Sequence, residues 1–207
     1  MIITISRQLG AGGGDVAQAI ADRLGWSVID NELIDEVAAR AGMPAEEVAE
    51  RDESAPGFIE RLARTLATAM PEFVAPEGGT LPELTEERLV KVTERVVADL
   101  AAQGQVVLVG RAAPAVLETH PNALHVRVAA PVAYRAARLV ERDGIDLKEA
   151  EKLIHEVDGN RGRYHKQYYG RDWDDASNYD LVVNTGRLGI EGAVDVILDR
   201  VARMERG

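Results

Sequence analysis

The chain has 207 residues, which is enough for one large α/β domain with a sizeable core. Its formal net charge of −11 argues against duplex nucleic acid as a partner, because phosphate backbones favour basic surfaces. It contains no cysteine, which excludes disulfide scaffolds, thiolate metal sites and cysteine nucleophiles.

The first ten residues, MIITISRQLG, lack the basic region and the long apolar core of a secretory signal. No apolar run in the chain approaches the roughly 18 residues that a membrane span needs. We therefore expect a soluble, cytoplasmic protein that has no membrane partner.

The opening of the chain predicts a strand, a glycine-rich loop and a helix. Residues 2–6 (IITIS) are β-branched and apolar, and the helical pattern VAQAIADRLG ends at Gly25. Backbone N–H groups of such a loop, together with a helix N-terminus, suit phosphate oxygens. The residues predicted to bind phosphate are Gly10, Ala11, Gly12, Gly13, Gly14 and Asp15. A tight turn without a ligand is the alternative interpretation.

This loop departs from the phosphate-binding pattern G-x-x-x-x-G-K-[ST]. Arg7 stands at the first glycine, Gly12 at the second, and Gly13 at the lysine. Because that lysine supplies positive charge to the β- and γ-phosphates, another cation must replace it or catalysis is poor. Arg7 is the first candidate, with a surface ion pair as its alternative. Asp15 could bind Mg²⁺ in place of a hydroxyl, or it could cap the helix.

The rest of the chain alternates between strands and helices. Further strands are predicted at 27–30, 106–110, 124–130 and 180–184, and helices at about 131–143, 146–166 and 189–205. Residues 44–102 have a helical pattern throughout. This alternation indicates a three-layer α/β fold with a parallel five-stranded sheet and helices on both faces. We expect one domain over residues 1–207, with 44–104 as a helical insertion.

The segment RGRYHKQYYGR, residues 161–171, carries four Lys or Arg and no acid. Three of the five tyrosines lie in it, and Trp173 follows. Aromatic side chains between arginines can stack on bases, including those of single-stranded RNA. Anchoring of this segment to its domain is the interpretation that we prefer.

Several segments resemble the cytidylate kinase-like family. ITISRQLGAGGGDVAQAIADRLG is similar to its opening, VVLVGRAAPAVL to its third strand with a Gly-Arg pair, and NYDLVVNTGRLGIEGAVDVIL to its fifth strand and last helix. The region from RLVERDG to HKQYYG resembles the family's lid. The resemblance covers nearly the whole chain except about 52–104. It implies a P-loop NTPase-type fold, a lid at about 144–176, and ATP with Mg²⁺ as cofactors.

The resemblance also implies an acceptor site. In cytidylate kinases an arginine after the third strand and an Asp-x-x-Arg lid motif bind the acceptor nucleotide, and the matching positions are Arg111, Asp158 and Arg161. Asp30, at the end of the second strand, is a further substrate-binding candidate. Thr185 matches a position where related kinases contact the donor base. For Asp158 and Arg161 an exposed i, i+3 pair is the alternative.

Phosphoryl transfer depends mainly on positioning and charge, so lid cations are candidates for neutralising the transferred group. With Arg7, the predicted catalytic residues are Arg161, Arg163 and Lys166. Arg171 is a candidate for the same neutralising role, and Arg138 and Arg142 are secondary candidates.

The expected function is transfer of the γ-phosphoryl group of ATP to a nucleoside monophosphate, and the resemblance favours CMP or dCMP. One alternative is a regulatory module that binds nucleotides with weak or no transfer, which the missing lysine favours. Another is a kinase for a phosphorylated metabolite outside nucleotide metabolism. The helices between 58 and 102 could cover the acceptor site or form a homodimer interface.

Overall fold

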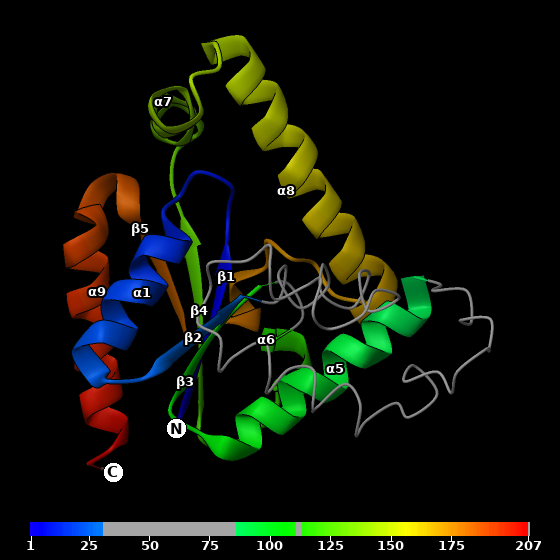
Figure 1. The fold of residues 1–207 in the computed structure, drawn as a ribbon, viewed down its shortest axis with the longest axis vertical. Coiled ribbons are helices and arrows are strands. Elements are labelled where there is room, and N and C mark those ends of the chain that lie inside the picture. The colour runs from blue at the N-terminus through cyan, green and yellow to red at the C-terminus, as the bar shows by residue number, and fades with distance from the viewer. Residues whose placement is uncertain (31–85, 111–112, 207) are drawn as a thin grey trace, which may run out of the picture.

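In the computed structural model, the described residues are 1–30, 86–110 and 113–206. Within them, one five-stranded sheet has the order β2-β3-β1-β4-β5, and every neighbouring pair is parallel (Figure 1). The strands are β1 (Ile2–Arg7), β2 (Ser27–Asp30), β3 (Val106–Val109), β4 (Ala123–Ala129) and β5 (Leu181–Asn184). The predicted five-stranded parallel sheet is confirmed.

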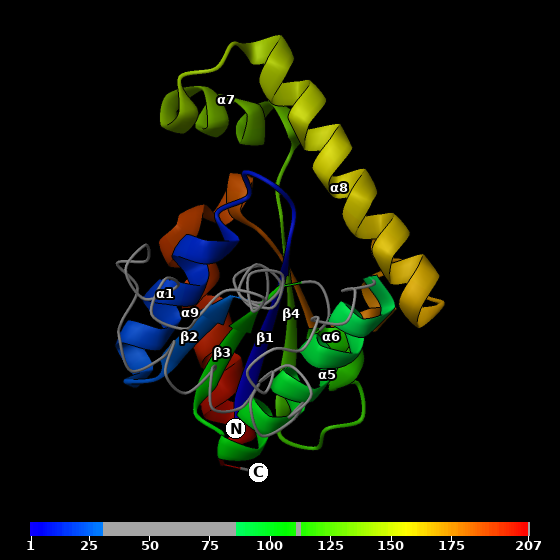
Figure 2. The ribbon, with the colours of Figure 1, turned by 45° about the vertical axis from the view of Figure 1, so that its right-hand side comes forward.

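Helices cover both faces of this sheet (Figure 2). One face packs on α1 (Gly13–Leu24) and α9 (Thr185–Met204), and the other on α5 (Glu86–Gln103) and α6 (Ala113–Val116). Side chains of β1 alternate between the two faces, as a strand requires. Ile3 and Ile5 join the core with α1 and α9, whereas Ile2 joins the core with α5. The predicted three-layer fold is therefore confirmed.

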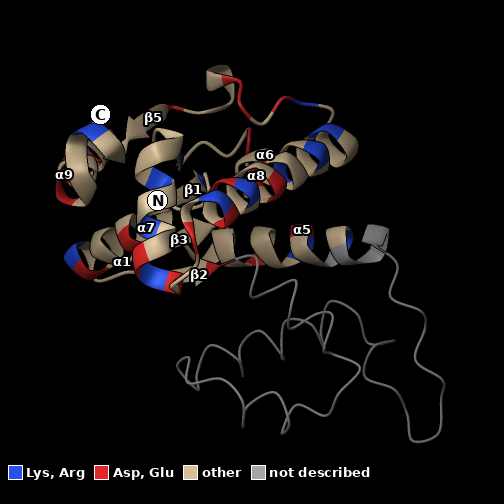
Figure 3. Ribbon diagram, turned by 90° about the horizontal axis from the view of Figure 1, so that it is seen from above, with Lys and Arg blue, Asp and Glu red and all other residues tan. Residues whose placement is uncertain are grey.

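Two further helices lie beyond the carboxyl edge of the sheet. They are α7 (Val132–Asp143) and α8 (Leu147–Tyr169), and α8 slopes from α7 down to the far end of α5 (Figures 1 and 2). Seen from above, Lys and Arg positions recur along α8 (Figure 3). The pair has a small core of its own, made by Ala136, Leu139, Ala150 and Ile154. It therefore forms a separate layer above the edge where ligands of α/β sheets bind.

Two helix boundaries differ from those predicted. Helix α8 continues three residues past the predicted end and stops at Gly170, a left-handed C-cap. Helix α9 starts at Thr185, four residues early, because a helical turn precedes the non-helical Gly189. A short 3₁₀ helix, Ala176–Asn178, leads into β5.

Most of the predicted insertion at 44–104 lies outside the described residues, and α5 is the part of it that can be examined. In α5 the side chains of Val96 and Val97 are fully buried. None of the helices in the described ranges combines the length with the apolar character that crossing a bilayer would require.

Candidate functional site

The glycine-rich loop turns the chain from β1 into α1 at the carboxyl edge of the sheet. Gly10 and Gly12 have φ values of 76° and 79°, in the left-handed region that favours glycine. A Cβ on Gly10 would lie 2.8 Å from the carbonyl oxygen of Arg135, so α7 packs directly on the loop. The first N–H groups of α1 have no partner within the helix and are suited to bind an anion.

A cavity of about 610 Å³ lies over this loop. That volume is within the range of about 300 to 1,000 Å³ that is usual for small-molecule sites. The loop, the end of β2, α7 and α8 all contribute to its wall. Its charged lining residues are Arg7, Asp15, Asp30, Arg138, Glu141, Arg142 and Arg161, and its lining glycines are Gly10, Gly12, Gly13 and Gly14. Most of the predicted phosphate-binding residues therefore share one cavity with three predicted catalytic or substrate-binding ones.

Arg7 and Asp30 are joined across the width of β3. Nη2 of Arg7 donates to both carboxylate oxygens of Asp30, at 3.0 and 3.1 Å. The side chains are 11% and 39% exposed. Arg7 does form the ion pair that the alternative interpretation expects. However, the pair lines the cavity, and the arginine side chain is mostly buried.

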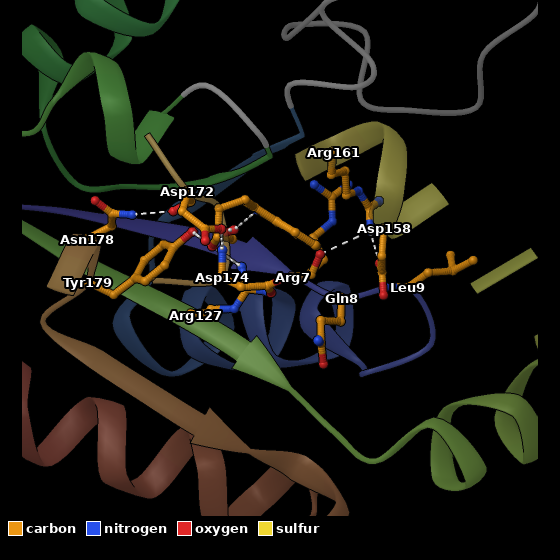
Figure 4. Close-up of polar contacts among 12 residues, drawn as sticks. Arg7, Gln8, Leu9, Arg127, Asp158, Arg161, Asp172, Asp174, Asn178 and Tyr179 are labelled. Carbon is orange, nitrogen blue, oxygen red and sulfur yellow. Dashed lines mark hydrogen bonds and ion pairs between the residues drawn. The ribbon is translucent and has the colours of Figure 1, made fainter. Parts of the chain in front are cut away.

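Helix α8 contacts the loop through Asp158 and Arg161 (Figure 4). Asp158 accepts a hydrogen bond from the Leu9 N–H at 2.9 Å and forms an ion pair with Arg135 at 2.6 Å. Arg161 donates to the carbonyl oxygen of Arg7 at 3.0 Å and lies 3.7 Å from Asp158. Because the two side chains are only 15% and 7% exposed, the alternative of an exposed i, i+3 pair is wrong.

Arg135 is the main residue of this site that the sequence did not single out. It is buried on α7, and besides Asp158 it donates to the carbonyl oxygens of Ala130 and Leu9, at 2.9 and 3.1 Å. These bonds join α7, α8 and the loop around one guanidinium group. The sequence signal was present, since Arg135, Arg138 and Arg142 recur at helical spacing, but spacing does not say which of them is buried.

Asp15 lies in the first turn of α1 and pairs with Arg138 of α7 at 2.6 Å. Its carboxylate lines the cavity beside the helix N-terminus, and Mg²⁺ in nucleotide sites is usually held by one or two carboxylates plus phosphate oxygens. The position therefore fits the predicted Mg²⁺ ligand. Across the described part of the chain, no cluster of three or more His, Asp or Glu side chains offers an all-protein metal site.

Other predicted site residues lie elsewhere. Thr185 is buried behind the loop, where its hydroxyl donates to the carbonyl oxygen of Ala11 at 2.7 Å. Arg163 and Lys166 are exposed on α8 and do not line the cavity. Arg111 lies outside the described residues.

The segment after α8 is fixed to the sheet by Trp173. Its side chain is 2% exposed, and its indole N–H donates to Ser6 Oγ at 2.8 Å. Arg127 of β4 donates to the Trp173 carbonyl oxygen at 2.7 Å and stacks 4.0 Å from the indole centroid. Arg127 also pairs with Asp174 (Figure 4). For Trp173 the structure agrees with anchoring rather than with base stacking, because its ring is not accessible.

Comparison with known proteins gives the family. A model described as the cytidylate kinase-like family matches residues 2–187. The cytidylate kinase of Methanocaldococcus jannaschii is 30% identical over 154 residues, which are 72% of this chain and 83% of that protein. The cytidylate kinase of Methanopyrus kandleri is 29% identical over 97% of this chain and 96% of its own length.

Solved structures agree on the fold. An uncharacterized protein from Eubacterium ventriosum has a TM-score of 0.71 at 22% identity, with 98% of both chains covered. A shikimate kinase from Bacteroides thetaiotaomicron has a TM-score of 0.53 at 16% identity, again with 98% of both chains covered. The chain therefore belongs to the cytidylate kinase-like family and is a nucleoside monophosphate kinase-like phosphotransferase with the P-loop kinase fold.

Proposed function

We propose that this protein transfers the γ-phosphoryl group of ATP to a nucleoside monophosphate, with CMP or dCMP as the favoured acceptor. The observation that carries the proposal is the cavity in which the loop glycines face arginines from β1, α7 and α8. Phosphoryl transfer needs this combination, because its catalysis is mostly positioning and stabilisation of phosphate charge. The cytidylate kinases that the chain matches support the choice of acceptor.

On the donor side, the amides of residues 12–14 and the N-terminus of α1 bind the phosphates of ATP. Arg7 and Arg161 line the same cavity and supply charge that the missing lysine would provide. Asp15 would hold Mg²⁺, and the bound metal would neutralise phosphate charge. Arg138 pairs with Oδ2 of Asp15 at 2.6 Å, so the metal would have to share this carboxylate with Arg138 or displace it.

On the acceptor side, Asp30, Arg111, Asp158 and Arg161 bind the monophosphate. A carboxylate can accept from a ribose hydroxyl or a cytosine amine, and a guanidinium can bind phosphate through two hydrogen bonds. Asp158 already accepts from Leu9 and Arg135, so an acceptor there would have to share or displace these contacts. The lid predicted at about 144–176 contains α8, and Arg163 and Lys166 would reach the phosphates only if it moved toward the loop.

A coupled assay tests the proposal, with MgATP and each of CMP, dCMP, UMP, AMP and GMP as acceptor. We expect turnover that is highest with CMP or dCMP. The negative control is Gly12→Val, because residue 12 has a φ of 79°, which a β-branched side chain adopts only with strain, so the loop should be distorted. Turnover that does not exceed this control with any monophosphate would remove the kinase assignment.

The rival function is a regulatory module that binds nucleotides without transfer. Calorimetry distinguishes the two, since the rival predicts binding of MgATP or a monophosphate with no product. An Arg111→Ala/Arg161→Ala variant tests the acceptor site separately. If CMP binds to it as tightly as to the unchanged protein, the acceptor lies elsewhere.

A further inference from the structure

Positions 7 and 13 compete for the same space. A Cβ built on Gly13 would lie 2.4 Å from Cβ of Arg7, 3.0 Å from its Cγ and 3.5 Å from its Cδ. Non-bonded carbon atoms pack at about 3.5 to 4.0 Å, so two Cβ atoms cannot share this place. One of the two positions must be glycine if the other carries a side chain.

The stem of Arg7 cannot move aside easily. Arg7 pairs with Val128 of β4 in the sheet, and its carbonyl oxygen accepts from Arg161 at 3.0 Å. At its far end, the guanidinium is held by both oxygens of Asp30. The side chain is thus fixed at the backbone and at the charge, and it lines the cavity between these points.

The usual phosphate-loop pattern has these two residue types the other way round, with glycine at the first position and lysine where Gly13 stands. The Cβ of a lysine at residue 13 would lie 2.4 Å from the Cβ of Arg7. We propose that the two positions have exchanged their side chains. Arg7 delivers from the strand the charge that the lysine delivers from the helix, and residue 13 is glycine because Arg7 needs its space.

This inference rests on the proposed function in one respect, that the charge serves a nucleoside triphosphate. Asp30 has the part of a positioning residue, which keeps the guanidinium at the cavity wall. An arginine fork and a lysine ammonium differ in geometry. The exchange therefore predicts that the loop accepts an arginine at position 7 only with glycine at position 13, and a lysine at position 13 only with glycine at position 7.

A stability measurement tests the steric half without any ligand. We expect Gly13→Ala to lower the urea midpoint strongly in the unchanged protein and in Arg7→Ala, which keeps the Cβ. In Arg7→Gly it should cost little. Gly14→Ala is the matched control for stability, because it lies in the same helical turn and its Cβ would meet nothing within 4 Å. An equal loss from Gly13→Ala in all three backgrounds would refute the exchange, as would an Arg7→Gly variant that does not fold.

Binding and turnover of MgATP test the charge half. Arg7→Gly and Gly13→Lys should each lose about 10²-fold or more in turnover, the usual cost of a missing preorganised charge. The double variant Arg7→Gly/Gly13→Lys should recover to within about tenfold of the unchanged protein. Arg7→Gly that binds and turns over MgATP normally, or a double variant no better than the single ones, would overturn the proposal. If the unchanged protein has no turnover, affinity for MgATP gives the same comparison, so failure of the kinase assignment is told apart from failure of the exchange.

Discussion

Two of the arginines that line the cavity are each paired with an aspartate from another element. Arg7 is held by Asp30, and Arg138 by Asp15. In a chain with a net charge of −11, such pairs keep guanidinium groups in place before a ligand arrives. A phosphate that enters the cavity must displace these carboxylates or share the guanidinium groups with them.

A second residue-scale feature is the buried His125 on β4. Its Nε2 lies 3.1 Å from the carbonyl oxygen of Leu117, and its Nδ1 lies 2.8 Å from the hydroxyl of Thr4. Since a carbonyl can only accept, Nε2 carries the proton and Nδ1 accepts from Thr4. Burial lowers the pKa of His125 below its ordinary value of 6.5, although Asp180 acts in the opposite direction.

This pKa shift predicts a loss of stability on mild acidification. Below about pH 6.5 the unfolded chain binds a proton at His125 more readily than the folded protein does. The free energy of unfolding therefore falls as the pH falls. Urea unfolding at pH 7.5 and pH 5.5 measures the difference. His125→Gln should reduce it, with His155→Gln on the exposed face of α8 as control. Equal pH dependence in both variants would contradict the prediction.

At the scale of elements, the loop, α7 and α8 form one unit around Arg135. Removing this arginine takes the closest cation from the largely buried Asp158, although the Leu9 N–H and Arg161 still contact it. We expect Arg135→Leu to lower the free energy of unfolding by about 3 kcal/mol, the lower end for a broken buried pair. Arg135→Leu/Asp158→Leu should cost less than the sum of the single changes. Arg203→Leu is the control, since its pair with Asp199 is exposed, and an equally small effect at Arg135 would contradict this account.

The attachment of the segment after α8 to the sheet through Trp173 is also a feature at the scale of elements. Trp173→Ala removes a fully buried indole and its bond to Ser6, so we expect a loss of about 3 to 5 kcal/mol. Hydrogen exchange should then increase over residues 171–179. The half-buried Trp26 offers a matched control through Trp26→Ala, which should cost less. Equal decreases in the free energy of unfolding for the two variants would contradict this role of Trp173.

At the scale of the molecule, the cavity and its arginines lie at the carboxyl edge of a parallel sheet, in a chain that is acidic as a whole. A ligand of this cavity would contact the loop, α7 and α8, so it should stabilise the whole domain. At 100 times its dissociation constant, MgATP should add about 2.7 kcal/mol and raise the Tm by about 5 to 10 °C. A thermal scan measures this, and an unchanged Tm at millimolar MgATP would contradict donor binding.

The sequence was sufficient for the order of the strands along the chain and for the glycine loop. Continuous apolar runs such as 106–109 and the change of period after residue 12 are local signals, which neighbouring residues determine. It also predicted Arg7 and Asp30 as site residues, and both line the cavity, but it did not predict that they bind each other. Arg135 was missed because burial on α7 depends on α8 and the loop, which are distant in the chain.

What the sequence determined by itself is thus the class of fold, the place of the phosphate loop and the absence of its lysine. The sequence made Arg7 the first candidate to replace that lysine, and the tertiary structure added the closeness of positions 7 and 13 that supports the proposed exchange. The reason is physical, since position 7 lies on a strand and position 13 on a helix, and the closeness of their Cβ positions exists only after the loop has folded between them.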